Sequence, residues 1–199
     1  MANEAAEVGL ESHTEVFDED EMLVAAACRD TQAAGRLYDK HYEAIFRYIC
    51  RCTPDRATAE DLTSNVFLAA FRHLKRLRWR PMRFQAWLYR IATNEIRMQY
   101  RRAKRIRAWR TTTGGSGIDT APPASDRSAA AEEYRLLHEA LLRLKPKYRT
   151  VIVLRYFEDR TIAEIAEITG RKEGTLRCHL HRGLAQLQDI LSRYGVLPR

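Results

Sequence analysis

The side chains with the clearest chemical use lie near the end of the chain, in the run TIAEIAEITGRKEGTLRCHLHRGLAQL from Thr161 to Leu187. Apolar residues repeat at helical spacing on both sides of a turn at Thr169-Gly170, which predicts a helix-turn-helix. The repeating residues are Ile162, Ile165, Ala166 and Ile168, followed by Leu176, Leu180, Leu184 and Leu187. If the two stripes share one core, the polar side chains of the second helix must point outward. They are Lys172, Glu173, Arg177, Cys178, His181 and Arg182.

This polar face suits a DNA major groove, where side chains exchange hydrogen bonds with base edges. An ordinary helical hairpin with a solvated charged face is the alternative, and these residues alone do not exclude it.

Other reactive side chains do not form a recognisable catalytic or metal site. The cysteines are Cys28, Cys50, Cys52 and Cys178. They lack the paired CxxC spacing of a structural zinc site, although Cys50 and Cys52 with His41 nearby leave a metal or redox pair open beside the simpler interpretation as reduced packing residues. Paired carboxylates in a basic cleft and a phosphate-cradling Gly-rich loop are also missing. The sequence therefore predicts no enzymatic activity, no cofactor and no bound metal.

A second chemical signal is the basic segment from Arg72 to Arg110, in which fourteen Lys and Arg face a single acid, Glu95. Its excess of positive charge is larger than the formal net charge of the whole chain, which is +8. Phosphate binding would neutralise these charges and release counterions, so the segment favours a polyanionic partner. Nucleic acid is the first candidate, and an anionic membrane is the second.

Aromatic rings lie among these positive charges. They are Trp79, Phe84, Trp87, Tyr89, Tyr100 and Trp109. Ring faces beside cations suit unstacked bases. Because Phe84, Trp87 and Ile91 are also spaced for a helical core, we expect some of the rings to be buried and others to lie at a DNA surface.

Helices must position these groups, since no strand pattern competes. Apolar periodicity predicts helix over 22–52, and a capping box of Thr58 with Asp61 predicts the start of another. A further helix is expected from Phe84 to about Arg107, and Pro146 suits the first turn of one that precedes the helix-turn-helix. The expected fold is all-α.

The composition divides the chain into four parts. Residues 1–21 hold eight acids and no Lys or Arg, which predicts an acidic, disordered tail. Residues 22–110 and 132–199 are expected to form two small helical domains, and residues 111–131, rich in Gly, Ser, Thr, Pro and Ala, a flexible linker. No run approaches the ~20 apolar residues of a membrane span and no signal peptide is recognisable, so we expect a soluble, cytoplasmic protein.

Three stretches together resemble a bacterial sigma factor of the extracytoplasmic-function (ECF) group, the two-domain branch of the primary sigma family. They are AEDLTSNVFLAAFRHL (59–74), FQAWLYRIATNEIRMQYRRAKR (84–105) and LLRLKPKYRTVIVLRYFEDRTIAEIAEITGRKEGTLRCHLHRGLAQL (141–187). The order of a basic aromatic domain, a linker and a helix-turn-helix is more specific than any one piece.

The resemblance implies an alternative sigma factor that binds core RNA polymerase, directs it to promoters and helps to open the duplex, without covalent chemistry. Residues 22–110 would be a region 2-like domain for the polymerase and the minus-ten element, and residues 132–199 a region 4-like domain for the minus-thirty-five element. The implied partners are the clamp helices of the largest polymerase subunit, the flap of the second-largest subunit, promoter DNA and an anti-sigma factor.

The resemblance also implies three sets of contact residues. Those for core polymerase are Asp61, Asn65 and Phe67. Those for the minus-ten element are Arg76, Arg78, Trp79, Arg80, Arg83, Phe84, Trp87, Arg90, Asn94, Arg97 and Arg101. Those for the minus-thirty-five element are Arg171, Lys172, Thr175, Arg177, Cys178, His181 and Arg182. A regulator that uses the helix-turn-helix without joining polymerase is the competing hypothesis.

Overall fold

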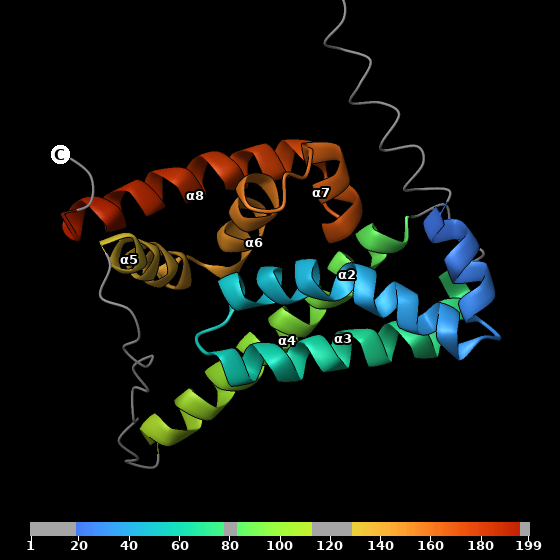
Figure 1. The fold of residues 1–199 in the computed structure, drawn as a ribbon. Coiled ribbons are helices and arrows are strands. Elements are labelled where there is room, and N and C mark those ends of the chain that lie inside the picture. Colours follow the sequence, from blue (N-terminus) through green and yellow to red (C-terminus); the bar gives the residue numbers. More distant parts are fainter. Residues whose placement is uncertain (1–18, 78–82, 113–128, 196–199) are drawn as a thin grey trace, which may run out of the picture.

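The computed structural model describes residues 19–77, 83–112 and 129–195, and every regular element in these ranges is a helix (Figure 1). A short helix covers 19–27. The others are α2 (Thr31–Cys52), α3 (Arg56–Leu77), α4 (Phe84–Thr112), α5 (Ala129–Arg143), α6 (Pro146–Tyr156), α7 (Ile162–Thr169) and α8 (Glu173–Arg193). The all-α prediction is confirmed for this part of the chain.

Two helix starts in the first unit differ from the prediction, and in both an Asp side chain is the reason. The expected helix over 22–52 is broken, because the Asp30 carboxylate accepts the backbone N–H of Gln32 at 2.9 Å and caps a new helix. Likewise Asp55, and not Thr58, begins α3, since its carboxylate accepts the N–H of Thr58 at 2.7 Å. The predicted capping box with Asp61 is therefore wrong.

The last residues of the predicted acidic tail belong to the folded unit. Asp20 is buried, and its carboxylate oxygens lie 3.0 Å from Lys40 Nζ and 3.0 Å from His41 Nε2. The prediction of a disordered tail is thus wrong for residues 19–21, while residues 1–18 lie outside the described part.

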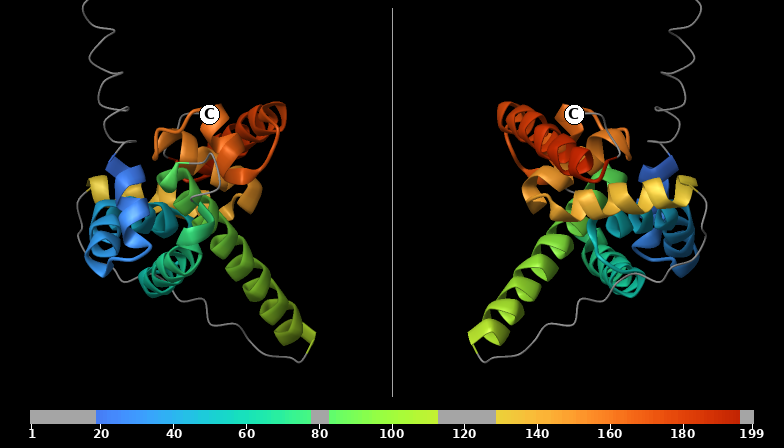
Figure 2. Two further views of the ribbon diagram at one scale, coloured as in Figure 1. Left: turned by 90° about the vertical axis from the view of Figure 1, so that its right-hand side faces the viewer. Right: turned by 90° about the vertical axis from the view of Figure 1, so that its left-hand side faces the viewer.

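Helices α2, α3 and α4 pack together into the first unit. Its interior includes Tyr48, whose hydroxyl lies 2.9 Å from Thr93 Oγ1, so a polar pair is satisfied within an apolar core. Among the described side chains of α4, the last buried one is that of Ile96, yet the helix continues to Thr112, beyond the predicted end near Arg107. Figure 2 shows this second half of α4 extending away from the other helices.

Helices α5 to α8 form the second unit, in which α8 packs against α5, α6 and α7. Pro146 occupies the first turn of α6, as predicted. The two units also contact each other, since α2 lies against α5 and α6, and α4 lies against α7 (Figure 1). The segment predicted as a linker lies mostly outside the described residues; its two ends, 111–112 and 129–131, are helical.

Candidate nucleic-acid interface

Side-chain and backbone caps define both ends of α7. Thr161 Oγ1 accepts the N–H of Glu164 at 3.2 Å, and the Glu164 carboxylate accepts the N–H of Thr161 at 2.8 Å, which makes a reciprocal capping box. Gly170 ends the helix with φ of 66°, a left-handed conformation that glycine adopts without steric cost. The chain then enters α8 at Glu173, so the predicted helix-turn-helix is confirmed.

The helix-turn-helix has a closed apolar interior formed by Ile165, Ile168 and Leu176. Leu187 is buried as predicted, whereas Leu184 is exposed, so its assignment to the core is wrong. The α7–α8 segment holds the predicted minus-thirty-five residues, and all of them are exposed: Arg171, Lys172, Thr175, Arg177, Cys178, His181 and Arg182. The outward polar face therefore exists in the structure.

One member of that face is already oriented by a neighbour on the same helix. Arg177 Nη2 lies 2.9 Å from Glu173 Oε2, one turn away, and both side chains are largely exposed. An exposed pair of this kind contributes little stability. The Arg177 guanidinium remains at the surface, where a base edge can compete with Glu173 for its hydrogen bonds.

A second candidate surface lies along α4. The residues Trp87, Arg90, Asn94, Arg97 and Arg101 follow one another at intervals of three and four, so they share one face of the helix. Asn94 and Arg101 are exposed, and the other three are half-buried. This face combines an indole ring, an amide and three guanidinium groups, which can stack on a base, hydrogen-bond its edge and bind phosphates.

Other predicted minus-ten residues are placed differently or lie outside the described part. Phe84 is only 3% exposed and packs edge-on against His41 with ring centroids 5.3 Å apart, so its ring belongs to the core and cannot stack on a base. Arg83 is exposed at the start of α4. The residues Arg78, Trp79 and Arg80, together with the side chain of Arg76, are not among those described.

Of the three predicted polymerase contacts, two are exposed and one is buried. Asp61 and Asn65 are exposed on one face of α3. Phe67 is 3% exposed and packs among aromatic rings, including that of Tyr38 at 4.7 Å, so its assignment as a contact is wrong. Leu68, by contrast, is 50% exposed and continues the face of Asp61 and Asn65. Leu68 was not predicted as a contact, although its i, i+4, i+7 spacing with Asp61 and Asn65 in the sequence indicates a shared helix face.

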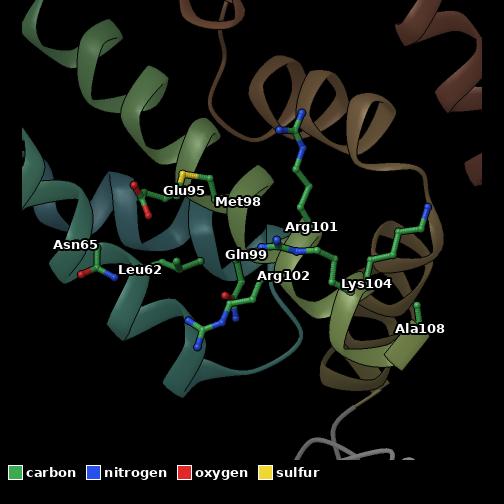
Figure 3. A pocket seen from close by; sticks show the side chains of 10 residues that line it. Leu62, Asn65, Glu95, Met98, Gln99, Arg101, Arg102, Lys104 and Ala108 are labelled. Carbon is green, nitrogen blue, oxygen red and sulfur yellow. The ribbon is translucent and has the colours of Figure 1, made fainter. Parts of the chain in front are cut away.

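A groove of about 740 Å³ runs between α3 and the projecting half of α4. Figure 3 shows Leu62 and Asn65 on the α3 side and Met98 and Arg102 on the α4 side. Met98 is largely exposed there. The groove thus joins the α3 surface to the basic part of α4.

The two candidate DNA surfaces meet where α4 contacts α7. Burial lowers the pKa of the Arg97 guanidinium, and the positive charge of Arg171 lowers it further. A Cβ atom on Gly170 would lie 3.9 Å from Arg90 Nη2, which shows how closely the turn approaches α4. Positive groups from both surfaces are therefore gathered at one place.

The described residues contain no cluster of three His, Cys, Asp or Glu side chains that could hold a metal ion. Burial raises the pKa of the Cys52 thiol to about 12 and also raises that of Cys50, so both favour the unreactive protonated form. Cys178 is exposed. None of the described helices is long and apolar enough to cross a membrane.

Comparison with known proteins identifies relatives of both units. The family Sigma-70 region 2 matches residues 37–106, and the family Sigma-70, region 4 matches residues 134–187. The "ECF RNA polymerase sigma factor SigL" of Mycobacterium tuberculosis is 32% identical over 171 residues, which cover 86% of this chain and 96% of that protein. The "ECF RNA polymerase sigma factor BldN" of Streptomyces coelicolor is 30% identical over 175 residues, and the match spans 65% of its length.

A solved structure shares the arrangement of helices. CnrH, determined in complex with the cytosolic domain of CnrY, superposes with a TM-score of 0.66 at 25% identity, and the match covers 88% of this chain and 98% of that one.

Proposed function

Because this chain belongs to the ECF group of RNA polymerase sigma factors, we propose that it directs core RNA polymerase to specific promoters and assists duplex opening when transcription starts. The observation that carries this function is that one chain presents two polar surfaces of the kind that bind nucleic acid, the outer face of α8 and the basic face of α4. A regulator that reads DNA with its helix-turn-helix alone would have no use for the second surface. In this role the protein contributes binding and no covalent chemistry.

The unit that contains α4 reads the minus-ten element in this proposal. Extruding a base costs about a few kcal/mol of stacking and pairing, which the protein must offset with its own contacts. Trp87 offers a ring face, and Asn94 offers an amide that can donate to and accept from a base edge. Arg90, Arg97 and Arg101 neutralise nearby phosphates.

The unit that contains α8 reads the minus-thirty-five element. Arg177, which is exposed on α8, can make a bidentate contact with guanine, worth about 1–3 kcal/mol of discrimination. Lys172 and Thr175, near the start of the helix, suit phosphates, which position the protein without specifying sequence.

The proposed protein partners follow from the exposed faces and from the family. The clamp helices of the largest polymerase subunit would contact α3 at Asp61, Asn65 and Leu68, and the second-largest subunit's flap would contact the second unit. The family resemblance implies an anti-sigma partner, and CnrH was solved with the cytosolic domain of a second protein, CnrY, so we also propose an anti-sigma partner for this chain. The site of action is the bacterial cytoplasm, where core polymerase works.

Binding of core polymerase tests the proposal against a polymerase-independent regulator. Tagged protein should retain purified bacterial core polymerase, and the double change Asn65→Ala with Leu68→Ala should weaken binding by roughly tenfold, as loss of central interface side chains does. Glu133→Ala, an exposed change on α5, is the matched control and should bind like the wild type. If the wild-type protein does not retain core polymerase, the regulator becomes the better explanation.

A further inference from the structure

The contact between the two units is centred on one buried carboxylate, that of Glu158. It lies in the segment between α6 and α7, and its side chain is only 4% exposed. One oxygen lies 3.0 Å from Arg51 Nη1 on α2, and the other accepts a hydrogen bond of 2.7 Å from the Tyr89 hydroxyl on α4. A single side chain of the second unit therefore binds two helices of the first.

Neighbouring contacts extend this junction. The Arg51 guanidinium lies 4.9 Å from the ring centre of Phe157, and the Arg160 guanidinium lies 5.0 Å from that of Tyr89. On the α5 side, His138 Nε2 is 3.0 Å from the backbone oxygen of Cys50. Polar and cation–ring contacts therefore surround the Glu158 carboxylate, and a separate hydrogen bond joins α5 to α2.

Glu158 is the charge that these contacts surround. Burial raises its pKa, while the Tyr89 hydroxyl, Arg51 and, at longer range, Arg47 and Arg160 act to keep it ionised. Removing one partner of a buried ion pair leaves an uncompensated charge, which is strongly destabilising. Without the Glu158 carboxylate, the positive groups that surround it would face each other across the contact.

The contact between the units holds the two candidate DNA surfaces closer together than the two promoter elements are on the duplex. The minus-ten and minus-thirty-five elements lie about 25 base pairs apart, which at about 3.4 Å per base pair is roughly 85 Å along the duplex. In this structure a Cβ atom on Gly170, in the turn between α7 and α8, would lie 3.9 Å from Arg90 Nη2 on the α4 face, and the charge of Arg171 in the same turn lowers the pKa of Arg97. Both surfaces cannot lie on their elements at once unless the units separate.

We propose that Glu158 latches a closed form of the chain that cannot hold both promoter elements, and that promoter engagement requires this latch to open. The inference rests on the proposed function for its consequence, although the latch itself is a property of the free protein. A larger closed fraction lowers the apparent affinity of the protein for a promoter, because only the open fraction can bind both elements.

The test compares the full-length wild type with Glu158→Gln, which removes the charge and keeps the shape of the side chain. Glu167→Gln is the matched control, since it removes the same charge from an exposed position on α7. Small-angle X-ray scattering of the free proteins should show a larger radius of gyration for Glu158→Gln alone, at unchanged helicity by circular dichroism. Arg51→Gln should open the chain as well, and combining it with Glu158→Gln should add little, because both act on one contact.

A second readout uses a promoter fragment on which the wild type supports transcription with core polymerase. Glu158→Gln should reach half-maximal transcription at a roughly tenfold lower protein concentration, the factor expected when one charge-assisted hydrogen bond no longer favours the closed form. Unchanged scattering in both Glu158→Gln and Arg51→Gln overturns the latch. If the scattering changes but no promoter fragment responds to any variant or to the wild type, the latch stands and the proposed function fails.

Discussion

Among single residues, His179 links the stability of the helix-turn-helix to pH. Its ring packs edge-on against Tyr148 with centroids 5.5 Å apart, and its Nδ1 atom is buried without a hydrogen-bond partner in the described part of the chain. Burial lowers the pKa of His179, and the positive charges of Arg171, Lys147 and Arg182 lower it further. The neutral ring therefore contributes its full stability above the unfolded pKa of about 6.5, and this contribution is lost as the pH falls through the folded value.

Thermal unfolding between about pH 8 and about pH 5.5, above the range where ordinary carboxyl groups titrate, measures this effect. The wild type should lose stability over that interval, and His179→Gln should lose less, because the titrating ring is gone. His181→Gln is the control, since His181 is exposed two residues away, and it should behave like the wild type. Equal losses in His179→Gln and in the wild type would contradict the assignment.

Single residues also mark where sequence reasoning succeeded and where it did not. The polar residues predicted to lie on the outer side of α8 are all exposed, because helical periodicity determines which side of a helix faces the core, although Leu184, predicted to lie in the core, is exposed as well. Phe67 and Phe84 were assigned as contacts from the family resemblance, yet both rings are buried. Burial of their large apolar rings in the core stabilises the fold, and a family resemblance does not show whether such a ring is buried or exposed.

At the level of helices, the packing of α8 on α6 depends on the absence of a side chain at Gly183. A Cβ atom there would lie 2.9 Å from Ile152 Cδ1 and 3.0 Å from Tyr148 Cβ. Both neighbours are buried, so neither has free space to move into. Gly183 is consequently what allows the two helices to pack this closely.

Gly183→Ala should lower the free energy of unfolding by about 1–3 kcal/mol, because overpacking outweighs the gain in helix propensity of about 1 kcal/mol. Gly174→Ala is the matched control in the first turn of the same helix, where nothing lies within 4 Å of the added methyl group. It should be neutral or stabilising in the same denaturant titration. A stabilising effect at both positions would show that α6 and α8 are not packed as described.

The helices were largely predictable, but their ends were less so. Periodicity indicated α2, α3, α4 and the helix-turn-helix, since each buries a repeating apolar face. The ends depend on single hydrogen bonds from Asp30 and Asp55, and a sequence pattern does not show which of several polar residues will supply the cap. The end of α4 was missed because none of the described side chains after Ile96 is buried, so this part of the helix has no apolar face that would indicate its length.

For the whole molecule, the contact between the two units could not be predicted. Arg51 and Glu158 are 107 residues apart, and each one looks like an ordinary exposed charge in its local sequence. Only the folded arrangement brings them together with Tyr89. The separate units and their surfaces follow from local patterns, whereas their relation to each other arises from non-local packing.

The measurement that tests the central claim most directly is run-off transcription from genomic promoter fragments, with purified core RNA polymerase in the presence and absence of this protein. We predict specific start sites that require the protein, that disappear with Arg177→Ala combined with Arg182→Ala, and that disappear independently with Asn94→Ala. Glu167→Ala, an exposed change outside both surfaces, should leave them intact. If core polymerase gains no start site from the wild-type protein, or if the start sites survive both sets of changes, the account of two promoter-reading surfaces is contradicted.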